Sequence, residues 1–97
     1  MSDKYILKDR KPVRCDDLVE WSKQFGSASR IVAQTNVRGI NVSTVFLGID
    51  HNFSGGAPLL FETMVFGIGE DESQVRCSTW EEAEVQHAEA VAKAALG

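Results

Sequence analysis

Residues 42–67 read VSTVFLGIDHNFSGGAPLLFETMVFG, and this stretch decides the fold because it holds two long apolar runs joined by a Gly-rich connection. Successive side chains of a strand point to opposite faces, and neither face of the runs 42–49 and 59–66 is fully polar. Branched and aromatic residues in such runs are typical of central strands rather than edge strands. The two runs are therefore predicted to be central strands of a small sheet.

The connection between the runs spans residues 50–58 and is longer than the usual hairpin loop. Gly55 and Gly56 permit positive φ angles, while Pro58 restricts Ala57 to extended geometry. These residues predict a loop that is held in a defined shape.

The composition is typical of one compact domain covering residues 1–97, with 43% hydrophobic and 25% charged residues. The formal net charge of -4 disfavours non-specific binding to nucleic acid, which requires Lys and Arg side chains that neutralise phosphates. Basic residues gather near the N-terminus and acidic residues in the last third, which predicts a solvated surface of uneven charge.

Cys15 and Cys77 belong to no CxxC motif and no dense disulfide framework, so reduced and buried thiols are expected. The apolar run YIL near the N-terminus is too short for the core of a signal peptide. No segment approaches the ~18 apolar residues of a membrane helix. We therefore expect a cytoplasmic protein without a membrane partner.

A first helix is predicted over residues 17–25, where Asp16 or Asp17 supplies the N-cap and Gly26 follows the last turn. Its inward face is expected to carry the residues that recur at helical spacing, which are Leu18, Trp21, Ser22 and Phe25.

A second helix is predicted over residues 78–95, because Ser78 followed three residues later by Glu81 forms a capping box. Its inward stripe is expected to comprise Trp80, Ala83, His87, Val91 and Ala94. The many alanines of this helix favour a close approach to the sheet.

Short extended segments are predicted at residues 5–7, 12–15, 31–37 and 74–77. The order of strands, helix, strands and helix indicates an α+β fold, in which a small and mostly antiparallel sheet of about 4–6 strands carries two helices on one face. The second face of the apolar strands then needs a cover, which the partner in a homodimer can supply.

Asp50, His51, Glu62 and His87 are the candidate catalytic residues, since carboxylates and imidazoles serve as general acids and bases. Asp50, His51 and His87 are also candidate metal ligands. Whether the four side chains converge depends on a strand register that the sequence leaves open. His87 lacks a spaced partner such as HExxH and can equally be a satisfied interior histidine.

Each of these residues has an alternative structural role. A carboxylate at Glu62 in the middle of a strand is costly unless it is paired, and its cation could be Arg30, Arg38 or Arg76. The run 50–52 reads Asp-His-Asn, which is also typical turn chemistry, because Asp and Asn side chains bond to nearby backbone groups.

Other catalytic and cofactor motifs find no support. Residues 54–56 (SGG) lack the spacing and the following Lys of a phosphate-binding loop, and they precede a strand rather than a helix. No Ser lies in a GxSxG setting, and neither Cys has a His beside it in the sequence. No cofactor is therefore expected.

Three motifs carry a resemblance to a known group of proteins: VSTVFLGIDHNF at residues 42–53, GGAPLLFETMVFG at 55–67 and STWEEAEVQH at 78–87. With the segments at 5–7, 12–13 and 17–21, the chain resembles a family of small uncharacterised proteins of phage and prophage genomes. The resemblance covers almost the whole chain. It implies a viral accessory or host-takeover context and brings no activity, cofactor or catalytic residue.

Two functions remain open from the sequence. The favoured one is a non-enzymatic protein-binding module, an inhibitor or modulator of a host factor, which self-associates as a homodimer through the sheet face that the helices leave uncovered. The alternative is a small metal-dependent or acid/base enzyme that uses the cluster of Asp50, His51 and Glu62. The alternative requires these side chains to meet in one pocket.

Overall fold

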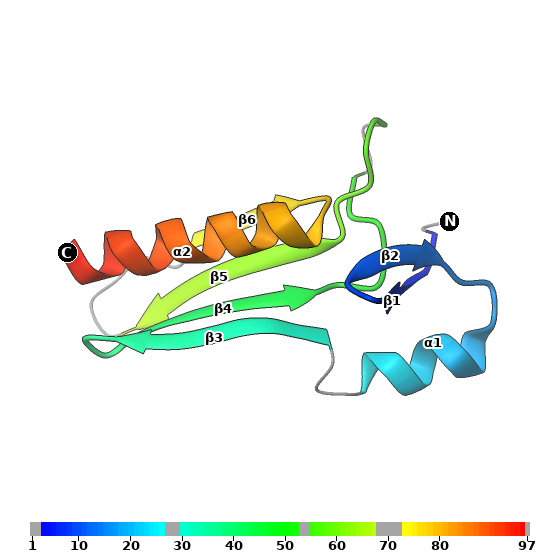
Figure 1. Ribbon diagram of the computed structural model, residues 1–97, viewed down its shortest axis with the longest axis horizontal. Coiled ribbons are helices and arrows are strands. Elements are labelled where there is room, and N and C mark those ends of the chain that lie inside the picture. The colour runs from blue at the N-terminus through cyan, green and yellow to red at the C-terminus, as the bar shows by residue number, and fades with distance from the viewer. Residues whose placement is uncertain (1–2, 27–29, 53–54, 68–72, 97) are drawn as a thin grey trace.

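The computed structural model describes residues 3–26, 30–52, 55–67 and 73–96, and an α+β fold is confirmed. In chain order the elements are β1 (Tyr5–Lys8), β2 (Lys11–Arg14), α1 (Leu18–Phe25), β3 (Ile31–Val37), β4 (Ile40–Phe46), β5 (Phe61–Gly67), β6 (Ser73–Cys77) and α2 (Trp80–Leu96). Strands β3, β4, β5 and β6 form an antiparallel sheet in that order, and β1 pairs with β2 in a separate hairpin. Helix α2 lies along one face of the four-stranded sheet (Figure 1).

The hairpin β1–β2 is attached to the residues that follow β4. The Tyr5 N–H donates to the Gly48 carbonyl at 2.8 Å, and the Asp50 N–H donates to the Asp3 carbonyl at 3.1 Å. Lys4 and Ile49 form an isolated antiparallel bridge at the same place. The predicted extended segments therefore form two sheets, and the hairpin contacts the chain just after β4 ends.

Helix α1 lies beyond the beginning of β3 and contacts β1, so that only α2 covers the face of the four-stranded sheet (Figure 1). Asp17 is its N-cap, as predicted, and accepts from the backbone of Val19 and Glu20. The expected inward face differs, because Leu18 is 59% exposed. The side chain of Phe25 lies outside the described part of the chain.

Two polar side chains hold α1 in this place. Trp21 donates its Nε1–H to the Gly48 carbonyl at 2.9 Å. Gln24 accepts from the Leu7 N–H at 2.5 Å and donates to the Leu7 carbonyl at 2.9 Å, and so pairs with β1 as another strand would. Apolar periodicity cannot reveal such a contact, because its partner is backbone that is distant in sequence.

The hydrophobic core lies between α2 and the sheet. Phe46, Leu60, Phe61, Cys77 and Ala83 are buried there. The Phe46 and Phe61 ring centroids lie 5.3 Å apart, and Trp80 meets Phe61 edge to face at 6.3 Å. The prediction of two central strands is confirmed, since β4 and β5 lie in the middle of the sheet. On β4, Val42, Thr44 and Phe46 face the core and are each at most 3% exposed. The inward stripe of α2 is confirmed as well, with Ala83, His87 and Ala94 buried.

The capping box of α2 lies one residue later than predicted. The Glu82 N–H donates to the Thr79 hydroxyl, and the Glu82 carboxylate accepts from the Thr79 N–H, each at 3.1 Å. Thr79 rather than Ser78 is therefore the N-cap, and Glu82 rather than Glu81 completes the box.

A two-residue turn joins β3 to β4. Arg38 and Gly39 have φ angles of 55° and 82°, the pattern of a type I′ turn, whose twist matches that of the strands. Val37 and Ile40 are partners on either side of the turn. This turn fixes the register of the hairpin as far as Ala33.

Candidate functional site

The face of the four-stranded sheet opposite α2 is called the open face below. The register places on it Ile31, Gln34 and Asn36 of β3, Asn41, Ser43 and Val45 of β4, Glu62, Met64 and Phe66 of β5, and Gln74 and Arg76 of β6. Their sequence neighbours Thr44 and Thr63 point to the other face, where both are buried. Neither helix covers the open face (Figure 1).

The open face is mostly neutral and partly apolar. Phe66 is 38% exposed and Ile31 37% exposed, and Val45 and Met64 are half-buried. A shallow groove of about 300 Å³ lies at one end of the face. It is lined by Gln34, Thr35, Asn36, Asn41, Val42, Ser43 and Phe66. Amide groups and one aromatic ring therefore dominate the groove.

Cross-strand pairs fix the polar side chains of the groove. The Asn36 amide donates to Asn41 Oδ1 at 2.9 Å, and the Gln34 amide lies 3.4 Å from the Ser43 hydroxyl. Such pairs are the usual stabilising units of an antiparallel sheet. They also leave hydrogen-bonding capacity for a partner, because an amide offers two donors and a carbonyl oxygen.

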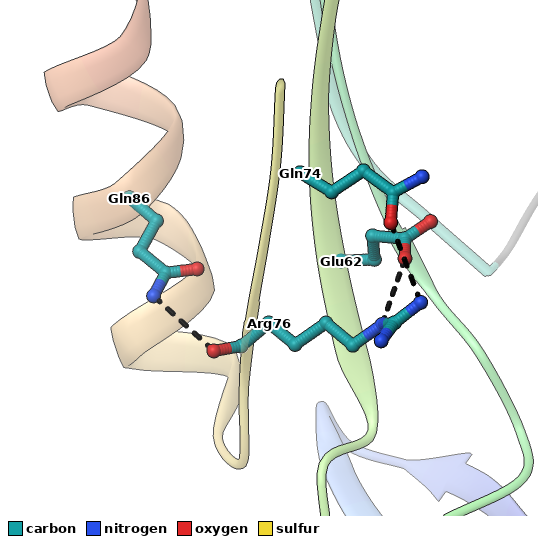
Figure 2. A network of polar contacts seen from close by, with 4 residues as sticks. All are labelled: Glu62, Gln74, Arg76 and Gln86. Atoms are coloured by element: carbon teal, nitrogen blue, oxygen red, sulfur yellow. Dashed lines mark hydrogen bonds and ion pairs between the residues drawn. The ribbon is translucent and has the colours of Figure 1, made fainter. Parts of the chain in front are cut away.

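Glu62 and Arg76 form an ion pair on the open face. Arg76 Nε lies 2.8 Å from Glu62 Oε2, and the Glu62 side chain is only 11% exposed. Figure 2 shows the guanidinium of Arg76 also reaching Gln74, while the Arg76 carbonyl points the opposite way and accepts from Gln86 of α2. Glu62 is therefore a paired strand residue, and Arg76 is its cation among the three considered from the sequence.

His87 lies on the other side of the sheet in a buried polar network. Its Nε2 lies 2.8 Å from the Thr35 hydroxyl, and its Nδ1 lies 2.8 Å from the Thr44 hydroxyl. Thr44 in turn lies 2.7 Å from the Thr63 hydroxyl. Burial lowers the pKa of His87 from its ordinary value, because the cation would lose its hydration. A neutral imidazole thus connects α2 to β3 and β4, and through Thr44 to β5.

Asp50 and Asn52 shape the connection between β4 and β5. Asp50 Oδ1 accepts from the Asn52 N–H at 2.8 Å and from the Leu59 N–H at 2.9 Å. Asn52 donates its side-chain amide to the Ala57 carbonyl at 2.8 Å. The turn interpretation is therefore confirmed for Asp50 and Asn52. The backbone of His51 takes part as well, donating to the Leu59 carbonyl at 3.0 Å.

The four candidate catalytic residues occupy three different places. Glu62 is on the open face, His87 is beneath α2 on the opposite face, and Asp50 and His51 lie beyond the end of β4. Glu62 and His87 are not brought together. Within the described ranges, no group of three or more His, Cys, Asp and Glu side chains is placed to hold a metal ion.

Both cysteines are free and buried. Burial, together with the charge of Glu82, raises the pKa of the Cys77 thiol to about 11, although hydrogen bonding from the Thr79 backbone acts in the opposite direction. Cys77 is consequently a protonated core thiol at neutral pH rather than a nucleophile.

Sequence reasoning missed the partners of His87. In the strand pattern, Thr44 shares a face with Val42 and Phe46, so a hydroxyl within an apolar face was the available signal. A buried hydroxyl requires a polar partner. The identity of that partner depends on the register between α2 and the sheet, which the sequence leaves open.

Comparisons with known proteins gave no match, whether to family models, to curated proteins or to solved structures. In the part of the chain that the structure describes, no helix is long and apolar enough to cross a membrane.

Proposed function

We propose that this protein is a non-enzymatic protein-binding module whose docking surface is the open face. The observation that carries the proposal is the neutral and partly apolar character of this face in a chain of net charge -4. On the four strands, the charged residues of the face are Glu62 and Arg76, which neutralise each other.

The chemistry of the open face suits a protein partner. Protein interfaces are depleted of charge at their centre and enriched in aromatic residues and Met. Phe66 and Met64 lie side by side with the amide pairs of Asn36 and Asn41, which gives apolar contact and directional hydrogen bonding in one surface. A partner whose polar groups hydrogen-bond to these amides would bind more tightly than a partner whose polar groups cannot.

The sequence resemblance to small phage and prophage proteins supplies the biological context. The proposed partner is a host factor, which this protein inhibits or modulates in the host cytoplasm. A flat sheet face with few charges can cover a surface of another protein without any chemistry of its own. No activity, metal or cofactor is part of the proposal.

The enzymatic alternative is not favoured by the geometry. It required Asp50, His51 and Glu62 to meet, with His87 as a further member of the cluster. The Asp50 carboxylate accepts hydrogen bonds from two backbone N–H groups, and the Glu62 carboxylate forms an ion pair with Arg76. Glu62 and His87 lie on opposite faces of the sheet, so one substrate cannot reach both.

Photocrosslinking in the natural host tests the proposal. A benzophenone analogue replaces Phe66 on the open face or, as the control, Val85, which is 57% exposed on the outer side of α2. We expect one discrete adduct with another protein from position 66 and none from position 85. Equal adducts from both positions, or none from position 66, would exclude the open face as the docking surface.

A further inference from the structure

In the described part of the chain, three strand edges carry groups that hinder pairing with a further strand, and these groups differ from edge to edge. Gln24 pairs with the backbone of Leu7 on the outer edge of β1. The short edge strand β2 contains Pro12 and charged residues on both sides of it. On β6, Gln86 of α2 donates to the outward carbonyl of Arg76, at 3.5 Å.

The outer edge of β3 carries none of these groups. Its sequence, IVAQTNV, has no charged residue and no Pro over seven residues. No side chain in the described part of the chain hydrogen-bonds to the outer backbone of this strand. A long, neutral edge of this kind is a template for pairing with a further strand.

The hairpin turn determines which backbone groups face outward. A two-residue type I′ hairpin closes on a hydrogen-bonded pair, here Val37 and Ile40, and hydrogen-bonded pairs then alternate along the ladder. Thr35 therefore bonds to β4, whereas the N–H and C=O groups of Gln34 and Asn36 point away from the sheet. These four groups are available to another strand.

We propose that the other strand is β3 of a second copy, paired antiparallel about a two-fold axis at Thr35. Gln34 then exchanges both backbone hydrogen bonds with Asn36 of the second copy, and Asn36 does so with Gln34. The two four-stranded sheets become one continuous sheet of eight strands. This interface goes beyond the proposed function and does not rest on it, because it uses the strand edge and leaves the middle of the open face exposed.

The neutral side chains of this edge are compatible with a second copy of the chain. Each chain has a net charge of -4 and repels its copy, so a self-contact must be free of charge. In this register Thr35 faces Thr35, Gln34 faces Asn36 and Ala33 faces Val37, which are all neutral pairs. Arg38 would lie opposite Val32 and not opposite another cation. The register also uses only the regular part of β3, since the irregularity lies between Ile31 and Ala33.

The side of α2 that overlooks β3 leaves room for the second copy. Gln86 points toward β6 and His87 toward the sheet, so Ala88 lies on the β3 side, because successive residues of a helix are about 100° apart. Ala95 falls on the same side by the same spacing. Both alanines are exposed and small. The charged groups on this side are Arg38, whose Nη1 donates to the Ala95 carbonyl at 3.1 Å, and Glu84, which lies one turn before Ala88.

Charge reversal across the interface tests the register. One variant carries Gln34→Lys and Asn36→Lys, and another carries Gln34→Glu and Asn36→Glu. Both positions are solvent-exposed in a single chain, so folding is retained, but each variant faces its own charge in the dimer. We expect the wild type at twice the 10.7 kDa of one chain and both variants as monomers by light scattering of the purified protein.

The decisive part of the experiment is to mix the lysine variant with the glutamate variant. Every lysine then faces a glutamate, so a heterodimer should form, and native mass spectrometry identifies it by its mass. Gln74→Lys on β6 is the matched control and should remain dimeric. A monomeric wild type at the highest soluble concentration, lysine variants that stay dimeric, or a mixture without heterodimer would each overturn the proposal. Because the purified chain is used alone, such a failure leaves the proposed binding function to be judged by crosslinking at Phe66.

Discussion

Thr44 is the residue through which α2, β4 and β5 share one polar contact. Its hydroxyl lies 2.8 Å from His87 Nδ1 and 2.7 Å from the Thr63 hydroxyl, and the side chain is fully buried. A hydroxyl bridges two polar groups in this way because it is at once a donor and an acceptor. Removing the Thr44 hydroxyl would leave His87 Nδ1 and the Thr63 hydroxyl without this hydrogen-bond partner in a buried environment.

The substitution Thr44→Val should therefore destabilise the protein by roughly 2–4 kcal/mol, since each stranded polar group costs about 1–3 kcal/mol. Urea unfolding measures the loss. Ser43→Ala, one residue earlier and on the open face, is the matched control and should change the free energy of unfolding by less than about 1 kcal/mol. A loss at Thr44 no larger than that at Ser43 would contradict the buried network.

His87 gives the protein a dependence on pH with a definite sign. Its pKa is lowered by burial, whereas in the unfolded chain it has its ordinary value of 6.5. As pH falls through 6.5 and toward the lower folded pKa, the unfolded state binds more protons than the folded state, and the free energy of unfolding decreases. The stabilisation is fully present above pH 6.5 and is lost on the acid side.

The comparison of wild type with His87→Gln isolates this effect. The stability advantage of the wild type should shrink between about pH 7.5 and about pH 5.5, by at most about 1.4 kcal/mol per pH unit for one proton. Urea titrations at the two pH values measure it. An advantage that grows toward acid pH would mean that the folded protein binds the proton more tightly than the unfolded chain.

Cys77 should be inert to alkylation in the folded protein. Its pKa of about 11, raised mainly by burial, leaves almost no thiolate at neutral pH, and the side chain is 6% exposed. Iodoacetamide labelling followed by peptide mass spectrometry should show slow modification in buffer and rapid modification in urea. Rapid labelling without denaturant would contradict the position of Cys77 in the core.

At the scale of elements, the start of α2 shows why a correct pattern can be placed one residue early. The sequence STWEE contains two overlapping capping boxes, Ser78 with Glu81 and Thr79 with Glu82. Both satisfy the same rule, and the structure uses the second. Which box forms depends on the path of the chain between β6 and α2, and that path is set by tertiary contacts.

Thr79→Ala should accordingly cost about 1 kcal/mol of stability, the usual loss on removing an N-cap hydroxyl. Ser78→Ala preserves the observed cap and should cost only a few tenths of a kcal/mol. Thermal unfolding of the two variants side by side decides between the boxes. A larger loss for Ser78→Ala would restore the box predicted from the sequence.

Strand periodicity and strand register differ in how far the sequence determines them. The division of the β4 side chains between two faces could be predicted because alternation is a property of one strand. Which of the two faces is buried could not be predicted, because both are largely apolar. Which residue of β5 faces Thr44, and which residue of α2 reaches it, depends on contacts between distant segments, so the network around His87 could not be predicted. The sequence offered three possible cations as the partner of Glu62. The pairing of β5 with β6 places Arg76 opposite Glu62, and the two form the ion pair. The position of α1 was hidden because Gln24 bonds to backbone.

At the scale of the whole molecule, the fold separates two surfaces with different chemistry. The face beneath α2 contains the aromatic core and the neutral His87, and the open face presents amides, Phe66 and one internal ion pair. The edge of β3 borders the open face, so a dimer through this edge would join two open faces into one longer surface. The proposed partner-binding surface would then be duplicated about the two-fold axis.

Native mass spectrometry of the protein purified from its natural host tests the central claim most directly. The wild type is compared with Phe66→Glu, which places a charge in the groove of the open face, and with Val85→Glu on the exposed side of α2. We expect a complex with another protein for the wild type and for Val85→Glu, and its loss for Phe66→Glu. A complex that survives Phe66→Glu unchanged, or the absence of any protein partner from the wild type, would contradict a docking role for the open face.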